Sequence, residues 1–84
     1  MELFFTKCFR KDYKRLPANV QNRTDKKLDF LLQDIRHPSL RIKKVKKYKE
    51  LFELSITMQY RCLFSIKNNV CALHRIGKHD EILK

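Results

Sequence analysis

The segment "RIGKH", from Arg75 to His79, holds groups that can bind a phosphate and move a proton. The guanidinium of Arg75 can meet negative charge with planar donors, and the imidazole of His79 can accept and donate a proton. Proton transfer by a positioned side chain is typically worth ~10²–10⁴-fold in rate. Gly77, the only glycine of the chain, would allow a sharp bend that carries His79 back over the sheet. We therefore expect chemistry on a phosphate near this end.

The first half of the chain predicts a strand and two helices that could support such a site. Residues 2–5, "ELFF", suit a short strand, and Thr6 can cap a helix over residues 7–15. Pro17 suits the first turn of a second helix, roughly residues 17–35, which carries apolar residues at helical spacing. Pro38 ends this helix, because the residue before a proline is pushed out of helical geometry.

The second half predicts strands, because its apolar residues alternate. The even positions of "LFELSITM" are Phe52, Leu54, Ile56 and Met58, as expected for a half-buried strand. "YRCLFSI" and "VCALHRI" predict two more strands, and residues 40–46 predict an edge strand with lysines facing water. The fold class is therefore α+β in one domain, residues 1–84. An N-terminal strand and an antiparallel helical hairpin pack on one face of a small, mainly antiparallel sheet of four to five strands.

The turn between the last two strands decides which side chains share a face. We predict a three-residue loop of Lys67, Asn68 and Asn69, which places Arg61 opposite Arg75, away from the helices. A two-residue turn would mix Arg75 with the apolar face. In the predicted register His74 lies under the helices, as a core histidine. The two arginines either grip a phosphate or pair with carboxylates such as Glu53 and Glu81, and the sequence leaves both options open.

Charge points to a polyanionic partner. The chain has 20 lysines and arginines against 9 acids, net +11. Residues 37–84 hold eleven basic and four acidic groups, and the densest run contains Arg41, Lys43, Lys44, Lys46, Lys47 and Lys49. Nucleic acid, an acidic protein or anionic lipid would match such a charge. We assign the run to RNA contact, with an acidic protein segment as the alternative occupant.

The cysteines and the hydropathy restrict the setting of the protein. Three cysteines without dense spacing predict reduced, buried thiols in a cytoplasmic protein. No apolar run is long enough to cross a bilayer, so no membrane partner is expected. Cys71, His74 and His79 could be considered as zinc ligands, but the register separates Cys71 from His74 and a fourth ligand is missing. We therefore expect neither a metal nor a cofactor.

At these residues the sequence resembles a known family. The segments "FFTKCFRKDYKRLP", "DIRHPSLRIKKVKKYKELFELSITMQYRCLFSI" and "ALHRIGKHDEIL" resemble the RelE/ParE superfamily of toxins, most closely the RelE and YafQ-type messenger-RNA interferases. The resemblance implies metal-free, ribosome-dependent cleavage of mRNA, in which the 2′-hydroxyl attacks its own phosphate. It also implies a cognate antitoxin, with any contact to operator DNA made through the antitoxin complex. Because Arg61, Arg75 and His79 match positions in the family's motifs, the resemblance implies catalytic roles for these residues.

The sequence departs from the family pattern at several positions. Phe52 and Leu54 stand where RelE-type toxins carry lysines, and Ser55 and Gln59 stand where YafQ-type toxins carry a histidine and an aspartate. Leu83 replaces the aromatic residue that often follows the terminal histidine. The second proton-transfer group is therefore not assigned by the resemblance, and Lys43, Lys44, Lys46 and His37 stay open as substitutes.

Two other functions remain as alternatives. A ParE-like toxin would share this fold but inhibit DNA gyrase, and the Arg75 and His79 pair favours the nuclease over it. A non-catalytic basic RNA-binding module would need exposed aromatic residues to stack on bases, whereas Phe52, Tyr60 and Phe64 are predicted in the core.

Overall fold

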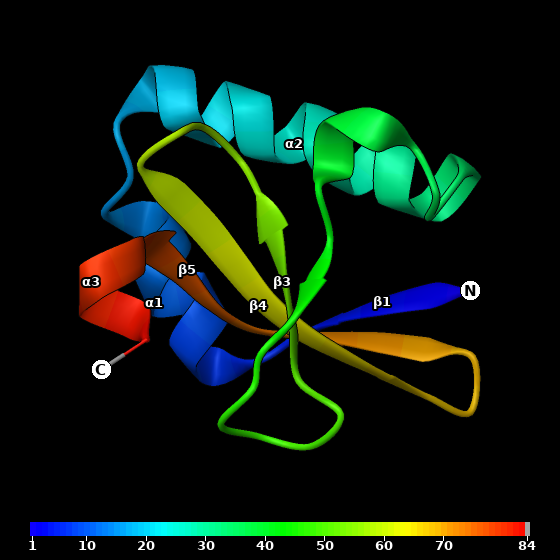
Figure 1. Ribbon diagram of the computed structural model, residues 1–84. Helices are drawn as coiled ribbons and strands as arrows, with labels where there is room; N and C mark the ends of the chain where they lie inside the picture. The colour runs from blue at the N-terminus through cyan, green and yellow to red at the C-terminus, as the bar shows by residue number, and fades with distance from the viewer. Residues whose placement is uncertain (84) are drawn as a thin grey trace.

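Two helices lie on one face of a five-stranded sheet in the computed structural model, which describes residues 1–83 (Figure 1). The strand order is β1-β5-β4-β3-β2, with β1 parallel to β5 and the other neighbours antiparallel. The α+β fold class is confirmed. In chain order the elements are β1 (Glu2–Phe5), α1 (Lys7–Lys14), α2 (Ala18–Gln33), the 3-10 turn η1 (Pro38–Leu40), β2 (Lys43–Lys44), β3 (Phe52–Ser55), β4 (Tyr60–Lys67), β5 (Val70–Lys78) and α3 (His79–Ile82).

Thr6 connects the first strand, the first helix and the last strand. Its hydroxyl accepts a hydrogen bond from the Phe9 N–H at 3.2 Å, which confirms it as the N-cap of α1. The same hydroxyl donates to the Leu73 carbonyl at 2.8 Å. Pro17 is the N-cap of α2, so this helix begins at Ala18, one residue later than predicted. The start of α1 is thus fixed to β5, the strand that carries the predicted site.

The core lies between the helices and the near face of the sheet, called here the covered face. Because cross-strand partners share a face, pairing places Phe52 with Phe64 and Leu54 with Cys62 on it. The buried side chains from this face and from the helices form one cluster: Phe9, Leu16, Val20, Leu28, Leu31, Leu54, Cys62, Phe64, Cys71, Leu73 and Ile76. The opposite, uncovered face carries Glu53, Ser55, Arg61, Leu63, Ser65, His74 and Arg75.

The β4–β5 hairpin has a two-residue turn, so the predicted three-residue loop is wrong. Lys67 pairs with Val70, and Asn68 and Asn69 both have positive φ, 53° and 63°. Asparagine tolerates this left-handed conformation, which the tight hairpin turns require. Arg61 consequently lies opposite Gly77 rather than opposite Arg75.

A β-bulge at His74 keeps Arg75 away from the core despite this shorter turn. Phe64 pairs with Leu73, but the adjacent Leu63 pairs with Arg75, so His74 is an extra residue in β5. Both His74 and Arg75 therefore face the uncovered side. The prediction that His74 is a core histidine is wrong, because the bulge turns it away from the helices.

Several smaller expectations are corrected. Strand β3 ends at Ser55, and Met58, expected to point inward, is 91% exposed in the following turn. Cys8 is exposed rather than buried. Gly77 continues β5 instead of bending it; a Cβ there would meet Ile82 Cγ2 at 3.1 Å, so the glycine allows α3 to pack closely. Within residues 1–83, no helix combines the length and apolar character needed to span a membrane.

Candidate functional site

Arg61 is bound to the turn that precedes it. Its Nη1 donates to the Thr57 carbonyl and, at 3.1 Å, to the Tyr60 carbonyl. The side chain is half-buried on the uncovered face at the start of β4. In this position Arg61 fixes the β3–β4 connection, and its charge stays close to the far end of β5.

Arg75 is bound to a carboxylate from α1. Its Nε lies 2.7 Å from Asp12 Oδ2, and its Nη2 lies 3.3 Å from Oδ1. Asp12 also accepts a hydrogen bond from the backbone N–H of Ile76 at 3.1 Å. One carboxylate therefore binds both the Arg75 guanidinium and the backbone of β5. The hydrogen bond with Asp12 raises the pKa of Arg75 above its ordinary value. Of the two options that the sequence left open, Arg75 takes the ion pair, with Asp12 rather than Glu53 or Glu81.

His79 begins the short helix α3. Its N–H donates to the Gln59 carbonyl at 3.1 Å, and its Nδ1 lies 3.5 Å from Asp80 Oδ1. The side chain is 55% exposed and borders a cavity shared with Met58, Gln59 and Lys78. This imidazole is accessible, but the protein contacts around it are few.

The three predicted site residues lie near one end of β5 without converging. The register puts Arg61 and Arg75 on the same face, with Arg61 opposite Gly77, and His79 follows two residues later. Their side chains, however, interact with different partners: a turn, a helix carboxylate and the neighbouring Asp80. The predicted convergence is wrong for this conformation, because the contacts of each side chain draw it elsewhere.

A second cavity lies on the uncovered face, between the segment Tyr48–Leu51 and strands β4 and β5. Its volume is about 400 Å³, and Ser65, His74 and Arg75 line it from the sheet. Ser65 Oγ and His74 Nε2 are 2.7 Å apart, a short hydrogen bond. The sequence prediction placed this histidine on the opposite face, because a bulge is not visible in an alternating pattern.

The basic run is confirmed as exposed, and its Lys49 lines this cavity. Arg41, Lys43, Lys44, Lys46, Lys47 and Lys49 are all exposed side chains. Tyr48, within the run, is 49% exposed, and Lys47 Nζ lies 5.9 Å from its ring centroid. An aromatic ring among lysines can stack on a base while the lysines contact phosphates. Tyr48 was missed, although its position inside the run was a usable signal.

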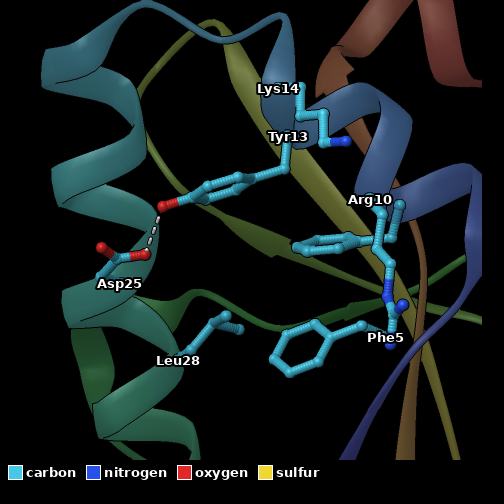
Figure 2. Close-up of a pocket in the computed structure, with 7 residues that line it drawn as sticks. Phe5, Arg10, Tyr13, Lys14, Asp25 and Leu28 are labelled. Atoms are coloured by element: carbon cyan, nitrogen blue, oxygen red, sulfur yellow. Dashed lines mark hydrogen bonds between the residues drawn. The ribbon is translucent and has the colours of Figure 1, made fainter.

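A third hollow lies between α1 and α2, with a volume of about 480 Å³ (Figure 2). Phe5, Phe9 and Leu28 give it an apolar floor, and Arg10 lies at its rim. Across it, Tyr13 Oη donates to Asp25 Oδ1 at 2.8 Å, and this bond raises the pKa of Tyr13. The Tyr13 hydroxyl and the Asp25 carboxylate thus bond to each other. The groove is therefore better suited to binding apolar side chains than to catalysing a reaction.

The residues considered for zinc are not brought together. Cys71 is buried on the covered face, whereas His74 faces the opposite side of the sheet. Residues 1–83 contain no group of three histidine, cysteine or acidic side chains placed to share a metal ion. Burial raises the pKa of the Cys62 and Cys71 thiols, that of Cys71 to about 11, so neither is a ready nucleophile.

Solved structures with the same architecture identify the fold. YafQ from Escherichia coli strain BL21(DE3) superposes with a TM-score of 0.84 at 10% identity, covering 99% of this chain and 98% of that one. RelE in the RelB–RelE antitoxin–toxin complex from Methanococcus jannaschii gives 0.79 at 21% identity, covering 95% and 94%. This chain has the RelE-type toxin fold. A copper-bound mutant toxin from Helicobacter pylori gives 0.74 at 23% identity, covering 98% of both chains.

The likeness concerns the fold, since the identities are low. Comparison of the sequence with protein-family models gave no match, and comparison with curated proteins gave none. In this chain the uncovered face of β4 and β5 lies beside Lys49 of the basic run.

Proposed function

We propose that this protein is the toxin of a type II toxin–antitoxin pair, an endoribonuclease that cleaves mRNA on the ribosome. Proteins with this fold include RelE in a complex with RelB and YafQ in a complex with DinJ, which supports an antitoxin as partner. The observation that carries the nuclease proposal is the uncovered-face cavity, where Arg75 and a histidine lie beside an exposed basic segment. Such a surface suits a phosphate backbone.

The proposed reaction needs no metal. The 2′-hydroxyl attacks the adjacent phosphate, and basic side chains stabilise the charge that develops on it. Asp12 occupies Nε and one donor of Nη2 of Arg75, so Nη1 remains to bind a phosphate oxygen. Arg61 adds positive charge at the same end of the sheet. His79 is the proton-transfer group that the family resemblance implies.

The basic segment would hold the protein on ribosomal RNA, with Arg41, Lys43, Lys44, Lys46, Lys47 and Lys49 as phosphate contacts. Binding through these side chains should weaken steeply with salt, because each neutralised phosphate releases counterions. The same segment offers an acidic antitoxin a surface to cover, which would block RNA access. In this scheme the antitoxin inhibits by occupying the docking surface.

Cell-free translation with primer-extension mapping of the message tests the proposal. Breaks within codons that require ribosomes are expected from the wild-type protein. A DNA gyrase supercoiling assay run in parallel tests the ParE-like alternative. Lost supercoiling with an intact message would replace the nuclease by the gyrase inhibitor, and ribosome binding without breaks would favour the non-catalytic RNA-binding module.

Growth arrest provides a check in cells. Expression without an antitoxin should stop growth, and Arg75→Ala or His79→Ala should relieve the arrest while the protein still folds. Circular dichroism of the purified variants verifies folding. Undiminished toxicity of both variants would remove the site that the resemblance implies.

A further inference from the structure

The bulge in β5 adds one residue, His74, and does not change the face on which any other residue of the strand lies. Phe64 pairs with Leu73 and Leu63 pairs with Arg75, so β5 has one residue more than β4 over this step. Without His74, Arg75 would follow Leu73 directly and still face Leu63. Every other residue would keep its present side of the sheet. Bulges interrupt the ladder and often occur beside active sites, where they redirect a side chain.

The bulge puts a histidine and an arginine side by side on one face. In a regular strand, successive side chains point to opposite faces. His74 and Arg75 instead both line the cavity of about 400 Å³ on the uncovered side. A proton carrier and a phosphate-binding group thus share one hollow without any loop rearrangement.

Ser65 holds the imidazole in place. Its hydroxyl lies 2.7 Å from His74 Nε2, and both residues are half-buried. When Nε2–H donates to Ser65, Nδ1 carries the lone pair that can take a proton. His79, by comparison, has a largely exposed ring whose nearest acidic neighbour is the fully exposed Asp80.

We infer that His74 is the base that takes the 2′-hydroxyl proton in RNA cleavage, an inference that rests on the proposed function. The proton passes to the imidazole as the oxygen's electron pair forms the O2′–P bond. The P–O5′ bond breaks, and the departing O5′ takes a proton from solvent by way of His79, the proton-transfer group of the proposed function. The products are a 2′,3′-cyclic phosphate and a 5′-hydroxyl, and the imidazolium returns its proton to solvent.

The groups around His74 fit this step. Arg75 borders the same cavity and can bind the phosphate, and Lys49 lies on the opposite wall. Tyr48, also on that wall, offers a ring on which the adjoining base can stack. The cavity therefore takes a nucleotide with its phosphate toward β5.

Ribosome-programmed cleavage of a defined message by single variants tests this assignment. His74→Ala and His74→Gln should each reduce the cleavage rate at least ~100-fold, since a positioned base is worth ~10²–10⁴. Ser65→Ala should reduce it less, because it loosens the ring without removing it. Added imidazole should restore part of the activity of His74→Ala by entering the vacated space. A deletion of His74 should fold, as seen by circular dichroism, and fail to cleave.

The possible outcomes separate the two claims. Wild-type cleavage with either His74 variant within threefold of it would overturn the inference and leave the proposed function standing. A loss in His74→Ala that imidazole does not restore would also overturn it, because a structural defect is not repaired by a soluble base. An intact message with the wild-type protein would remove both claims.

Discussion

The two faces of the sheet use their residues differently. The covered face is apolar: Cys62, Phe64, Cys71, Leu73 and Ile76 are all buried there against the helices. The uncovered face carries hydroxyl, imidazole and guanidinium groups that bond to one another or to nearby backbone. The difference shows that stability is concentrated on one side, so the other side is left for polar groups with chemical use.

The bulge allows both faces to be satisfied within one strand. If His74 were paired regularly after the two-residue turn, Arg75 would lie opposite Cys62 on the covered face and Ile76 opposite Arg61 on the uncovered face. With His74 bulged out of the ladder, Leu73 and Ile76 both remain in the core while Arg75 stays outside. The site thus depends on a local irregularity in a strand whose other residues are fixed by packing.

A pair of leucines on adjacent strands measures the difference between the faces directly. Leu73→Ala removes a fully buried side chain from the covered face and should lower the free energy of unfolding by about 3 kcal/mol. Leu63→Ala also removes a buried side chain (5% exposed), but one that lies outside the core cluster and borders the uncovered-face cavity, so it should cost about half as much. Urea unfolding followed by circular dichroism gives both values. Equal losses would contradict the proposed division between the faces.

Asp12 connects α1 to the part of β5 that contains Arg75 and Ile76. Asp12→Ala removes its bonds to Arg75 and to the Ile76 N–H, with an expected loss of ~1–2 kcal/mol in unfolding free energy. Water compensates in part, because the Arg75 side chain is 44% exposed while Asp12 is 13% exposed. Asp29→Ala, an exposed position on α2, is the matched control and should leave stability unchanged. Equal stability of the two variants would mean that the ion pair adds nothing.

The reactivity of the cysteines gives the smallest expected difference between the covered face and the exposed surface. Burial raises the pKa of Cys71 to about 11, so at pH 8 about one molecule in a thousand carries its thiolate. Cys62 is shifted in the same direction, whereas Cys8 is exposed on α1. Iodoacetamide at pH 8 should modify one thiol rapidly in the native protein and three after unfolding, as counted by mass spectrometry. Rapid modification of two or more native thiols would show that the covered face opens readily.

Local sequence signals predicted most of the fold. The Thr6 cap, the breaks at Pro17 and Pro38 and the alternation in the C-terminal half placed the elements within a few residues. The hairpin was misjudged although Asn68 and Asn69 are a favoured two-residue turn. In a regular hairpin only the three-residue loop keeps Arg75 out of the core, whereas the bulge does so with a two-residue turn.

The site was less predictable because its geometry depends on distant contacts. Asp12 and Arg75 are 63 residues apart, and nothing local to either residue indicates the pair. Ser65 and His74 meet across the hairpin through the bulge, which alternation cannot show. The exposure of the lysine run, by contrast, followed from composition, since ammonium groups remain in water wherever the backbone leads them.

The parallel pairing of β1 with β5 also governs when the fold can form. Thr6 bonds to Leu73 across 67 residues, so the first strand has no sheet neighbour until the last strand has been synthesised. Long-range closure of this kind slows folding, because the entropy of joining the ends is lost before the contacts compensate. A nascent chain halted before residue 70 lacks β5 and with it both His74 and Arg75. The proposed RNA-cleaving site is therefore complete only after β5 has been synthesised.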